Sequence, residues 1–237
     1  MYSLYQGDCL KVMDELPDES IDLILTDPPY GTTACKWDTV IDLDLMWLQL
    51  KRVIKKNGAV VLFGSEPFSS RLRMSNIKQY KYDWVWDKVT HSNPLISKKQ
   101  PLSAHENIVV FYAKQPSYFP QMSKGEPGKR GGTSGKSETK GKIKLIRGAP
   151  SGELRYPKRI IVFSNANQME KTHPTQKPVA LMEYLIRTYT NPGETVLDFT
   201  MGSGTTGVAA RRLARYFIGV ELDNTYFEIA KNRIENV

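Results

Sequence analysis

The stretch Ile21-Asp22-Leu23-Ile24-Leu25-Thr26-Asp27-Pro28-Pro29-Tyr30 determines the fold expected for this chain. Residues 21–26 are mostly apolar and partly β-branched, which is typical of a buried strand in a parallel sheet. The two prolines end this strand, because neither can donate a backbone hydrogen bond and each restricts the residue before it. The sequence therefore places a carboxylate, two rigid carbonyls and an aromatic ring at the carboxyl end of a strand, where open α/β sheets bind ligands.

The residues that follow this strand suit a primary amine. The Asp27 carboxylate and the Pro28 carbonyl are acceptors that the prolines cannot fill with N–H groups of their own, so both suit an exocyclic –NH2 group of a nucleobase. Pro29 keeps the turn rigid, and Tyr30 offers a ring face on which a base can stack. The alternative interpretation is an ordinary strand-to-loop turn with an Asp at the surface.

A second ligand-binding pattern lies near the end of the chain. Residues 195–199 predict a buried strand, and Gly202-Ser203-Gly204 predicts a tight turn before a helix. Such a turn directs free backbone N–H groups and the positive end of a helix dipole at a ligand. Glu221 ends the next strand and can accept both hydroxyls of a ribose. Because Gly207 completes the spacing G-x-G-x-x-G, this pattern by itself is also compatible with NAD.

Together, Asp27-Pro28-Pro29-Tyr30 and Phe199-Thr200-Met201-Gly202-Ser203-Gly204-Thr205-Thr206 resemble the motifs of the amino-group DNA methyltransferases that use S-adenosyl-L-methionine. The acidic-proline block precedes the glycine block, as in the circularly permuted β group of that family, and His173-Pro174-Thr175-Gln176-Lys177-Pro178 lies in the expected place. The resemblance covers residues 1–113 and 172–237. The family usually has Pro and Phe where this chain has Phe199 and Thr200, a departure that affects side-chain contacts but not the loop.

The element order and the resemblance imply an α/β fold with a doubly wound, mostly parallel, seven-stranded sheet of the Rossmann-like methyltransferase type. Residues 1–113 are expected to form the catalytic half of one domain, residues 172–237 its cofactor-binding half, and residues 114–171 a target-recognition insertion. An antiparallel pair of strands, 82–88 and 107–112, is expected at the end of the sheet. Helices are predicted at 9–16, 43–54, 67–77, 178–190, 205–214 and 226–234, with Lys55–Gly58 as the C-terminal signal of the second.

The resemblance also implies which residues contact the cofactor. Asp198 and the backbone of 202–206 would face the methionine part, Thr175 and Lys177 its carboxylate, and Glu221 the ribose. Asp8 would approach the adenine, although its position equally suits the N-cap of the following helix, and Lys177 is alternatively an ordinary solvated lysine. The full expected set is Asp8, Asp27, Thr175, Lys177, Asp198, Thr200, Gly202, Ser203, Gly204, Thr205, Thr206 and Glu221.

The net charge of +8 is concentrated in one segment. Residues 121–160 contain eleven Lys or Arg, three Glu and eight of the 17 glycines, so the rest of the chain is neutral. We expect this segment to contact a polyanion, namely duplex DNA, and to be disordered without it; the alternative is a solvated loop. The expected DNA-binding residues are Lys36, Trp37, Lys88, Asn93, Lys129, Arg130, Lys136, Arg147, Arg155, Lys158 and Arg159.

Other features of the chain limit its class. Cys9 and Cys35 are the only cysteines, and with three scattered histidines they predict neither a disulfide framework nor a metal site. No apolar run approaches the roughly 18–20 residues that span a bilayer, and no signal peptide is indicated. We therefore expect a cytoplasmic protein that has no membrane partner and needs no metal.

The combined patterns predict a site-specific methyltransferase that modifies N6 of a flipped-out adenine in duplex DNA, with Asp27, Pro28, Pro29 and Tyr30 as the catalytic group. The amine-binding turn weighs against NAD, because nothing in the chain suggests a hydride acceptor. The alternatives are an N4-cytosine DNA methyltransferase, an enzyme with an RNA substrate, and a DNA-binding module with a vestigial cofactor pocket. Asp at position 27 favours adenine by resemblance. A homodimer and a cognate restriction nuclease are further partners that the sequence leaves open.

Overall fold

The computed structural model describes the chain except for residues 33–37, 93, 126–135, 138–140, 143–153 and 166–175. It contains two compact units. One comprises Met1–Phe119 together with Arg159–Val237, and the other comprises Pro120–Lys158. These limits differ from the predicted insertion boundaries of 114 and 171. The predicted disorder concerns a segment that lies largely outside the described residues.

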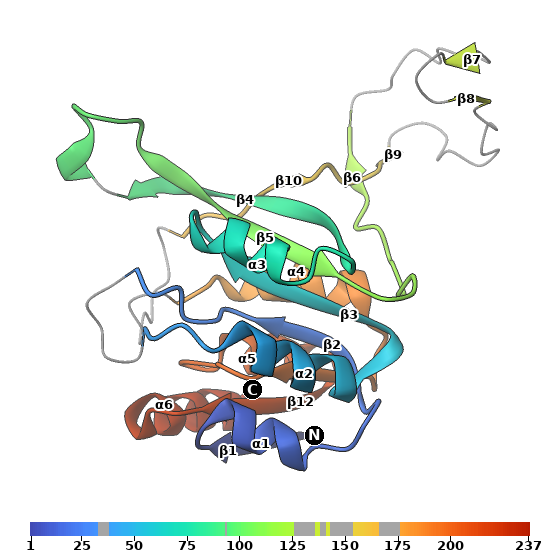
Figure 1. The fold of residues 1–237 in the computed structure, drawn as a ribbon, viewed down its shortest axis with the longest axis vertical. Coiled ribbons are helices and arrows are strands. Elements are labelled where there is room, and N and C mark those ends of the chain that lie inside the picture. Colours follow the sequence, from blue (N-terminus) through green and yellow to red (C-terminus); the bar gives the residue numbers. More distant parts are fainter. Residues whose placement is uncertain (33–37, 93, 126–135, 138–140, 143–153, 166–175) are drawn as a thin grey trace. The chain divides into compact units, whose positions relative to one another are not determined.

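The first unit is built on an eight-stranded sheet with the order β1-β12-β11-β2-β3-β5-β4-β10 (Figure 1). Neighbouring strands are parallel except where β5 is antiparallel to β3 and β4. The strands are β1 (Tyr2–Gln6), β2 (Ile21–Thr26), β3 (Ile54–Gly64), β4 (Tyr80–Ser92), β5 (Ser103–Phe111), β10 (Ile160–Val162), β11 (Thr195–Asp198) and β12 (Tyr216–Glu221). The mostly parallel α/β architecture is confirmed, with one strand more than the predicted seven.

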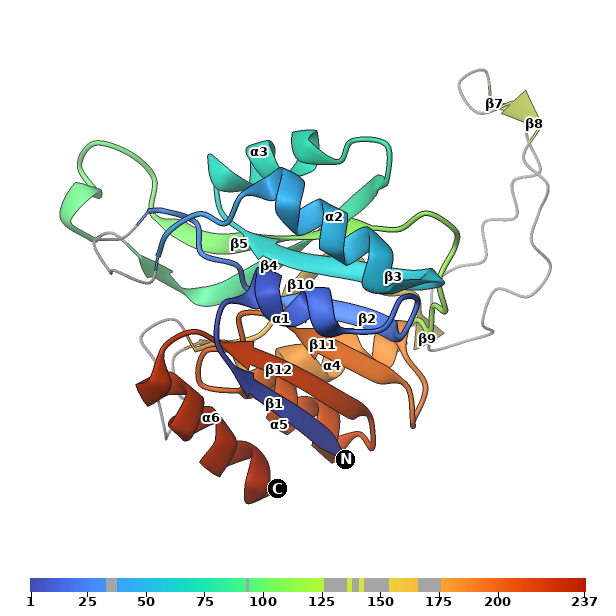
Figure 2. The same ribbon diagram turned by 60° about the horizontal axis from the view of Figure 1, so that its bottom comes forward.

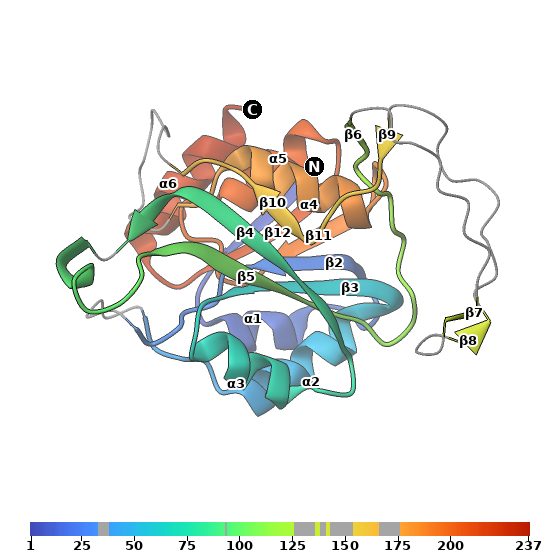
Figure 3. The ribbon, with the colours of Figure 1, turned by 90° about the horizontal axis from the view of Figure 1, so that it is seen from above.

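Helices cover both faces of this sheet. Figure 3 shows α1, α2 and α3 on one side of the sheet and α4, α5 and α6 on the other. Asp side chains cap the first turns of α1, α2 and α6 by accepting backbone N–H groups. The helices are α1 (Cys9–Glu15), α2 (Leu43–Val53), α3 (Phe68–Ser75), α4 (Val179–Tyr189), α5 (Thr205–Arg212) and α6 (Asn224–Glu235).

Two hydrophobic cores explain why the central strands are almost continuously apolar. In β2, Leu23 and Leu25 belong to the core beneath α4 and α5, whereas Ile24 belongs to the core beneath α1, α2 and α3. Successive residues of a strand point to opposite faces, so a strand with helices on both sides needs apolar residues at every position. The predicted buried strand at residues 21–26 is confirmed.

The second helix ends within one residue of its predicted end, but the signal expected there is wrong. The helix α2 ends at Val53 with Ile54 as its C-cap, and Lys55–Gly58, interpreted as its C-terminal signal, lies inside β3. Ile54 already has extended backbone angles, and its N–H closes the last helical turn on the Leu50 carbonyl. Lys55 then forms an ion pair at 2.7 Å with Asp22 of the adjacent strand. The contact with β2 therefore outweighs the local turn composition.

The far end of the sheet also differs from the prediction. The antiparallel pair β4 and β5 is confirmed, and the segment between them contains a short 3-10 helix, η1 (Pro94–Ile96). However, β10 lies outside β4 and is the edge strand. Its three residues come from the segment assigned to the insertion, and so short a run has no pattern that distinguishes it from a loop.

The second unit contains two short antiparallel pairs. Strand β6 (Ser123–Lys124) pairs with β9 (Leu154–Arg155), and β7 (Lys136–Ser137) pairs with β8 (Gly141–Lys142). None of the helices in the described part of the chain has the length and apolar composition needed to cross a bilayer.

The strand order brings the two ends of the chain together. Figure 2 shows β12 beside the N-terminal strand β1, and β11 separates β12 from β2. Because these four strands are parallel, their carboxyl ends lie at one edge of the sheet. Asp8, Asp27, Thr200 and Glu221 follow or end these strands. Residues far apart in sequence therefore meet at this edge.

Candidate active site

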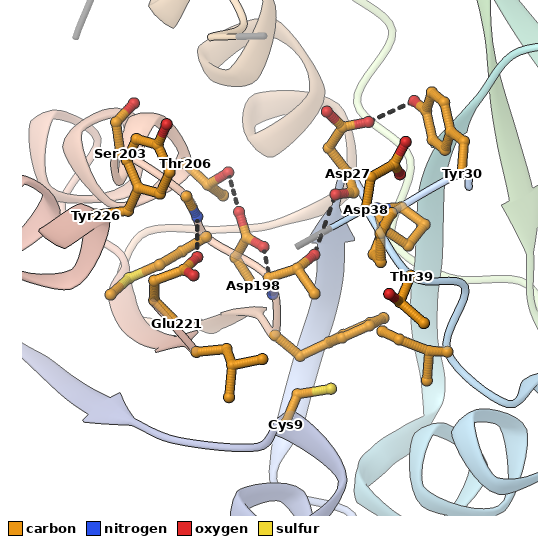
Figure 4. Close-up of a pocket in the computed structure, with 18 of the residues that line it drawn as sticks. Cys9, Asp27, Tyr30, Asp38, Thr39, Asp198, Ser203, Thr206, Glu221 and Tyr226 are labelled. Atoms are coloured by element: carbon orange, nitrogen blue, oxygen red, sulfur yellow. Dashed lines mark hydrogen bonds between the residues drawn. The ribbon is translucent and has the colours of Figure 1, made fainter. Parts of the chain in front are cut away.

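A cavity of about 470 Å³ opens at this edge of the sheet and is lined by both sequence motifs (Figure 4). Gly204 is absent from the lining, and Thr175 lies outside the described residues. The predicted site residues that line the cavity are Asp8, Asp27, Pro28, Pro29, Tyr30, Lys177, Asp198, Thr200, Gly202, Ser203, Thr205, Thr206 and Glu221. The acidic-proline turn and the glycine turn therefore share one cavity.

The glycine turn is shaped by backbone conformation and close packing. Gly202 and Gly204 have φ values of 52° and 78°, in the left-handed region that favours glycine. A Cβ atom on Gly204 would lie 2.9 Å from the Cβ of Ala230 in α6. Gly204 thus permits the turn conformation and the close packing against α6, whereas Gly202 and Ser203 line the cavity.

Glu221 joins the glycine turn to the end of β12. One carboxylate oxygen, Oε2, accepts a hydrogen bond from the Gly202 N–H at 2.8 Å, and Oε1 accepts one from the Asp223 N–H at 2.8 Å. Burial raises the pKa of Glu221 above its ordinary value, although these N–H donors oppose the shift. Each oxygen has a second lone pair for a hydroxyl group in the cavity.

Asp8 has the capping role that the sequence analysis left open. Its Oδ1 accepts hydrogen bonds from the backbone N–H groups of Leu10 and Lys11 at 2.9 and 3.2 Å. The N-cap interpretation is therefore confirmed. Asp8 also lines the cavity, so the adenine contact implied by resemblance stays a prediction.

Asp198 is a buried carboxylate held by neutral donors of the protein. Its Oδ1 accepts from the Thr26 hydroxyl at 2.5 Å and from the Thr200 N–H at 3.2 Å, and Oδ2 accepts from the Thr206 hydroxyl at 2.5 Å. Burial raises the pKa of Asp198 to about 6, and these donors limit the shift. The hydrogen bonds of Asp198 therefore link the end of β2, the turn after β11 and the start of α5.

Asp27 has partners on both carboxylate oxygens. The Tyr30 hydroxyl donates to Oδ1, and the Lys177 ammonium lies 2.8 Å from Oδ2. Burial raises the pKa of Asp27, with Lys177 acting in the opposite direction. The Tyr30 ring stacks on Phe68, with centroids 5.1 Å apart. One face of that ring is covered, so a base can stack only on the other.

Lys177 is the centre of a row of alternating charges. Its ammonium lies 2.8 Å from Asp27 and 2.8 Å from Glu106, and Lys88 lies 3.3 Å from the other oxygen of Glu106. The Lys177 side chain is only 7% exposed, and its ammonium lies 5.1 Å from the centre of the Phe63 ring. The solvated interpretation of Lys177 is therefore wrong.

Electrostatic effects in this row stabilise the charged forms of Lys177 and Glu106. Burial alone lowers the pKa of Lys177, but Asp27 and Glu106 together raise it above its ordinary value. Burial tends to raise the pKa of Glu106, yet Lys177 and Lys88 hold it below its usual range. Lys177 thus remains an ammonium that holds the Asp27 carboxylate.

Two further site residues were missed by sequence reasoning. Glu106 lies in β5, shortly before four buried apolar residues. A charged residue in the same strand as this buried run was the available signal. Asp38 lines the cavity and accepts hydrogen bonds from the N–H groups of Gly31 and Thr32 at 2.8 and 2.9 Å. It has no motif neighbour that would have identified it.

The charge of the lining indicates which ligand fits. Lys177 is the one basic side chain among the described lining residues. Carboxylates are supplied by Asp8, Asp27, Asp38, Asp42, Asp198 and Glu221. This excess of acid favours a cationic ligand such as a sulfonium compound, and it opposes the pyrophosphate of NAD by like-charge repulsion. Among the described residues, no group of His, Cys, Asp and Glu side chains is arranged to hold a metal ion.

The predicted DNA-binding residues that the structure describes lie in both units. Lys88 is 13% exposed and pairs with Glu106, and Arg159 lies over the Tyr82 ring at 5.6 Å. Lys136, Arg155 and Lys158 belong to the second unit. The remaining predicted DNA contacts lie outside the described residues: Lys36, Trp37, Asn93, Lys129, Arg130 and Arg147.

Comparison with known proteins identifies similar sequences and folds. The family described as DNA methylase matches residues 21–232 of this chain. The type II methyltransferase M.HpaI of Haemophilus parainfluenzae is 28% identical over 245 residues, which cover 97% of this chain and 73% of that protein.

Solved structures extend this similarity to the whole fold. The crystal structure of the M1.HpyAVI–SAM complex is 26% identical, with a TM-score of 0.68 over 99% of both chains. The PvuII DNA methyltransferase, described as cytosine-N4-specific, has the same TM-score at 21% identity over 98% of this chain and 86% of that one. This second likeness concerns the fold alone.

Proposed function

The chain belongs to the DNA methylase family and is an S-adenosyl-L-methionine-dependent DNA methyltransferase; from this premise we propose that it methylates N6 of an adenine flipped out of duplex DNA. The observation that supports the proposal is the shared cavity, which has amine acceptors on one side and an acid-lined glycine turn on the other. A flipped base and a methyl donor would meet between these two turns.

We propose that the glycine side holds the cofactor. Glu221 would accept the ribose hydroxyls, the N–H groups around Gly202–Thr206 would face the methionine part, and Asp8 would lie near the adenine. When bound, the cofactor supplies an electrophilic methyl group on a positively charged sulfur. The carboxylates of the lining would stabilise that positive charge before transfer and would exclude anionic ligands of similar size.

The acidic-proline side would bind the target amine. The amine is a weak nucleophile because its lone pair is conjugated with the ring. By accepting its two hydrogens, the Asp27 carboxylate and the Pro28 carbonyl would favour a pyramidal nitrogen and stabilise the positive charge that develops on it. The nitrogen must lose one proton after the N–C bond forms. Asp27 is the proposed acceptor, because burial raises its pKa.

Lys177 receives a different role from the one that the resemblance implied. Its ion pairs with Asp27 and Glu106 occupy the ammonium, so we propose that it positions Asp27 and does not bind the cofactor carboxylate. The Tyr30 hydroxyl would hold the second carboxylate oxygen while leaving a lone pair for the amine. The uncovered face of the Tyr30 ring would stack on the base.

Product analysis tests the choice of base. Purified protein, duplex DNA of mixed sequence and S-adenosyl-L-methionine with a labelled methyl group would be incubated, and the DNA would then be digested to nucleosides. We expect the label in N6-methyldeoxyadenosine. Label in N4-methyldeoxycytidine would overturn the adenine assignment, and preferential labelling of competing RNA would overturn the DNA substrate.

The Asp27→Asn variant tests the catalytic group. The amide keeps the size of the side chain but loses the charge that stabilises the amine, so we expect turnover to fall by at least about 100-fold. Calorimetric binding of S-adenosylhomocysteine should remain within a few-fold of the wild-type value. A variant with near-wild-type turnover would contradict the role of Asp27.

A further inference from the structure

The two turns that line the cavity are joined by a hydroxyl group on Thr200. The Thr200 hydroxyl donates a hydrogen bond to the backbone carbonyl of Asp27 at 3.1 Å, and it lies 2.7 Å from the Thr26 hydroxyl. The Thr200 N–H and the Thr26 hydroxyl both donate to Oδ1 of Asp198. Figure 4 shows Asp27 and Asp198 in the lining of the same cavity.

The acidic-proline turn needs a hydrogen-bond donor from elsewhere. Pro28 and Pro29 have no N–H groups, so the turn cannot satisfy its own carbonyls with donors at these two positions. The Asp27 carbonyl belongs to the peptide plane that leads into Pro28. A donor that fixes this plane restrains the backbone from the Asp27 Cα to the Pro28 Cα, and thereby the positions from which the Asp27 side chain and the Pro28 carbonyl extend.

Burial stabilises one end of the bridge. Thr26 is 0% exposed and Asp198 is 3% exposed, so water does not readily replace a lost hydrogen bond at these atoms, whereas Thr200 and Asp27 are half-buried. The Thr200 side chain can change rotamer only if its hydroxyl loses its contacts with both the Asp27 carbonyl and the Thr26 hydroxyl. Its position along the chain is equally constrained, because it lies two residues before Gly202, whose N–H is bound by Glu221.

The bridge therefore connects the two proposed ligand sites by a short path. A cofactor that binds Glu221 and the glycine turn acts on one end, and the Asp27 peptide lies at the other. Thr200 is also one of the two positions at which this chain departs from the family pattern.

We propose that Thr200 is a positioning residue that couples occupation of the glycine turn to the orientation of the Asp27 and Pro28 acceptors. This inference rests on the proposed function, since it assigns the two turns to cofactor and target base. Its consequence is an energetic coupling: cofactor binding should tighten binding of the target DNA, and DNA should tighten cofactor binding by the same factor.

Two matched variants test the coupling. Thr200→Val keeps the shape of the side chain and removes the hydroxyl, whereas Thr200→Ser keeps the hydroxyl. The affinity for duplex DNA of mixed sequence would be measured with and without S-adenosylhomocysteine, which has no methyl group to transfer. Turnover and the KM for S-adenosyl-L-methionine would be measured separately, and thermal unfolding would verify that each variant is folded.

We expect Thr200→Val to lower kcat by roughly tenfold, the size of a lost neutral hydrogen bond, with a much smaller change in KM. The factor by which S-adenosylhomocysteine tightens DNA binding should fall toward one, and Thr200→Ser should restore both values. Wild-type coupling in the folded Thr200→Val protein, or equal losses in both variants, would overturn the inference. Absence of methyl transfer by the wild-type protein would instead contradict the proposed function, because the binding measurement does not depend on turnover.

Discussion

The two sides of the cavity hold their carboxylates in different ways. On the glycine side, Asp198 and Glu221 are bound by backbone N–H groups and hydroxyls, and several of these donors lie within eight residues in the sequence. On the acidic-proline side, Asp27 accepts a hydrogen bond from the nearby Tyr30 hydroxyl, but its other oxygen is bound by Lys177, whose second partner Glu106 lies 71 residues away. Neutral local donors leave a carboxylate free to meet a cationic ligand, whereas a fixed cation controls the direction and charge of a reacting group.

Removal of the Lys177 ammonium should have the largest effect on both stability and turnover. Lys177→Met leaves the largely buried Asp27 carboxylate without a counter-charge and leaves Glu106 with its ion pair to Lys88. We expect a loss of about 3–5 kcal/mol in the free energy of unfolding and a fall in kcat of about 100-fold through misplacement of Asp27. Denaturant unfolding and steady-state kinetics would measure these changes.

Glu106→Gln is the milder companion to this variant. It keeps the size of the side chain and leaves Lys177 paired with Asp27, so its effects should be smaller in both measurements. Neither variant should weaken S-adenosylhomocysteine binding by more than a few-fold. Strongly weakened binding in Lys177→Met alone would favour the cofactor carboxylate as the partner of Lys177.

The next effect concerns the backbone of the glycine side. Gly204→Ala adds a Cβ 2.9 Å from Ala230 at a residue with a φ of 78°, so we expect a loss of about 2–4 kcal/mol in the free energy of unfolding. Gly193→Ala is the matched control, because Gly193 has a φ of 82° and nothing within 4 Å of the added Cβ. The Gly193→Ala variant should lose only about 1 kcal/mol in the free energy of unfolding, the cost of placing an alanine at a positive φ. Equal losses in the two variants would mean that close packing against α6 is unimportant.

The smallest effect is a pH dependence on the glycine side. The folded-state pKa of Asp198 is raised to about 6, above the roughly 3.9 of an unfolded chain. The native state therefore binds the proton more tightly, and the stability from this group is lost as the pH rises through 6.

Asp198→Asn isolates this contribution, because the amide does not titrate. Between pH 5 and pH 7, the stability of the wild-type protein relative to this variant should fall by about 1 kcal/mol. Urea unfolding at the two pH values measures the difference. A relative stability that rises over the same range would contradict the raised pKa.

Much of the fold could be predicted because its signals are local. A buried parallel strand needs a nearly continuous apolar run, and the pairs Asp27-Pro28 and Gly202-Ser203 mark where two such strands end. The predicted membership in the methyltransferase family, the α/β architecture and the antiparallel pair β4 and β5 are confirmed. The direct continuation of α2 into β3 could not be predicted, because the strand partners of residues 54–58, including Asp22 for Lys55, are distant in the sequence.

The sequence by itself determined the two turns: their prolines and glycines restrict the backbone wherever the turn is placed in space. Only the tertiary structure decided which side chains hold the reacting carboxylate. Lys177, Glu106 and Lys88 come from separate elements and meet because β4, β5 and the residues before α4 pack together. A charge in a sequence has no partner until folding supplies one, and burial then determines how strongly the two interact.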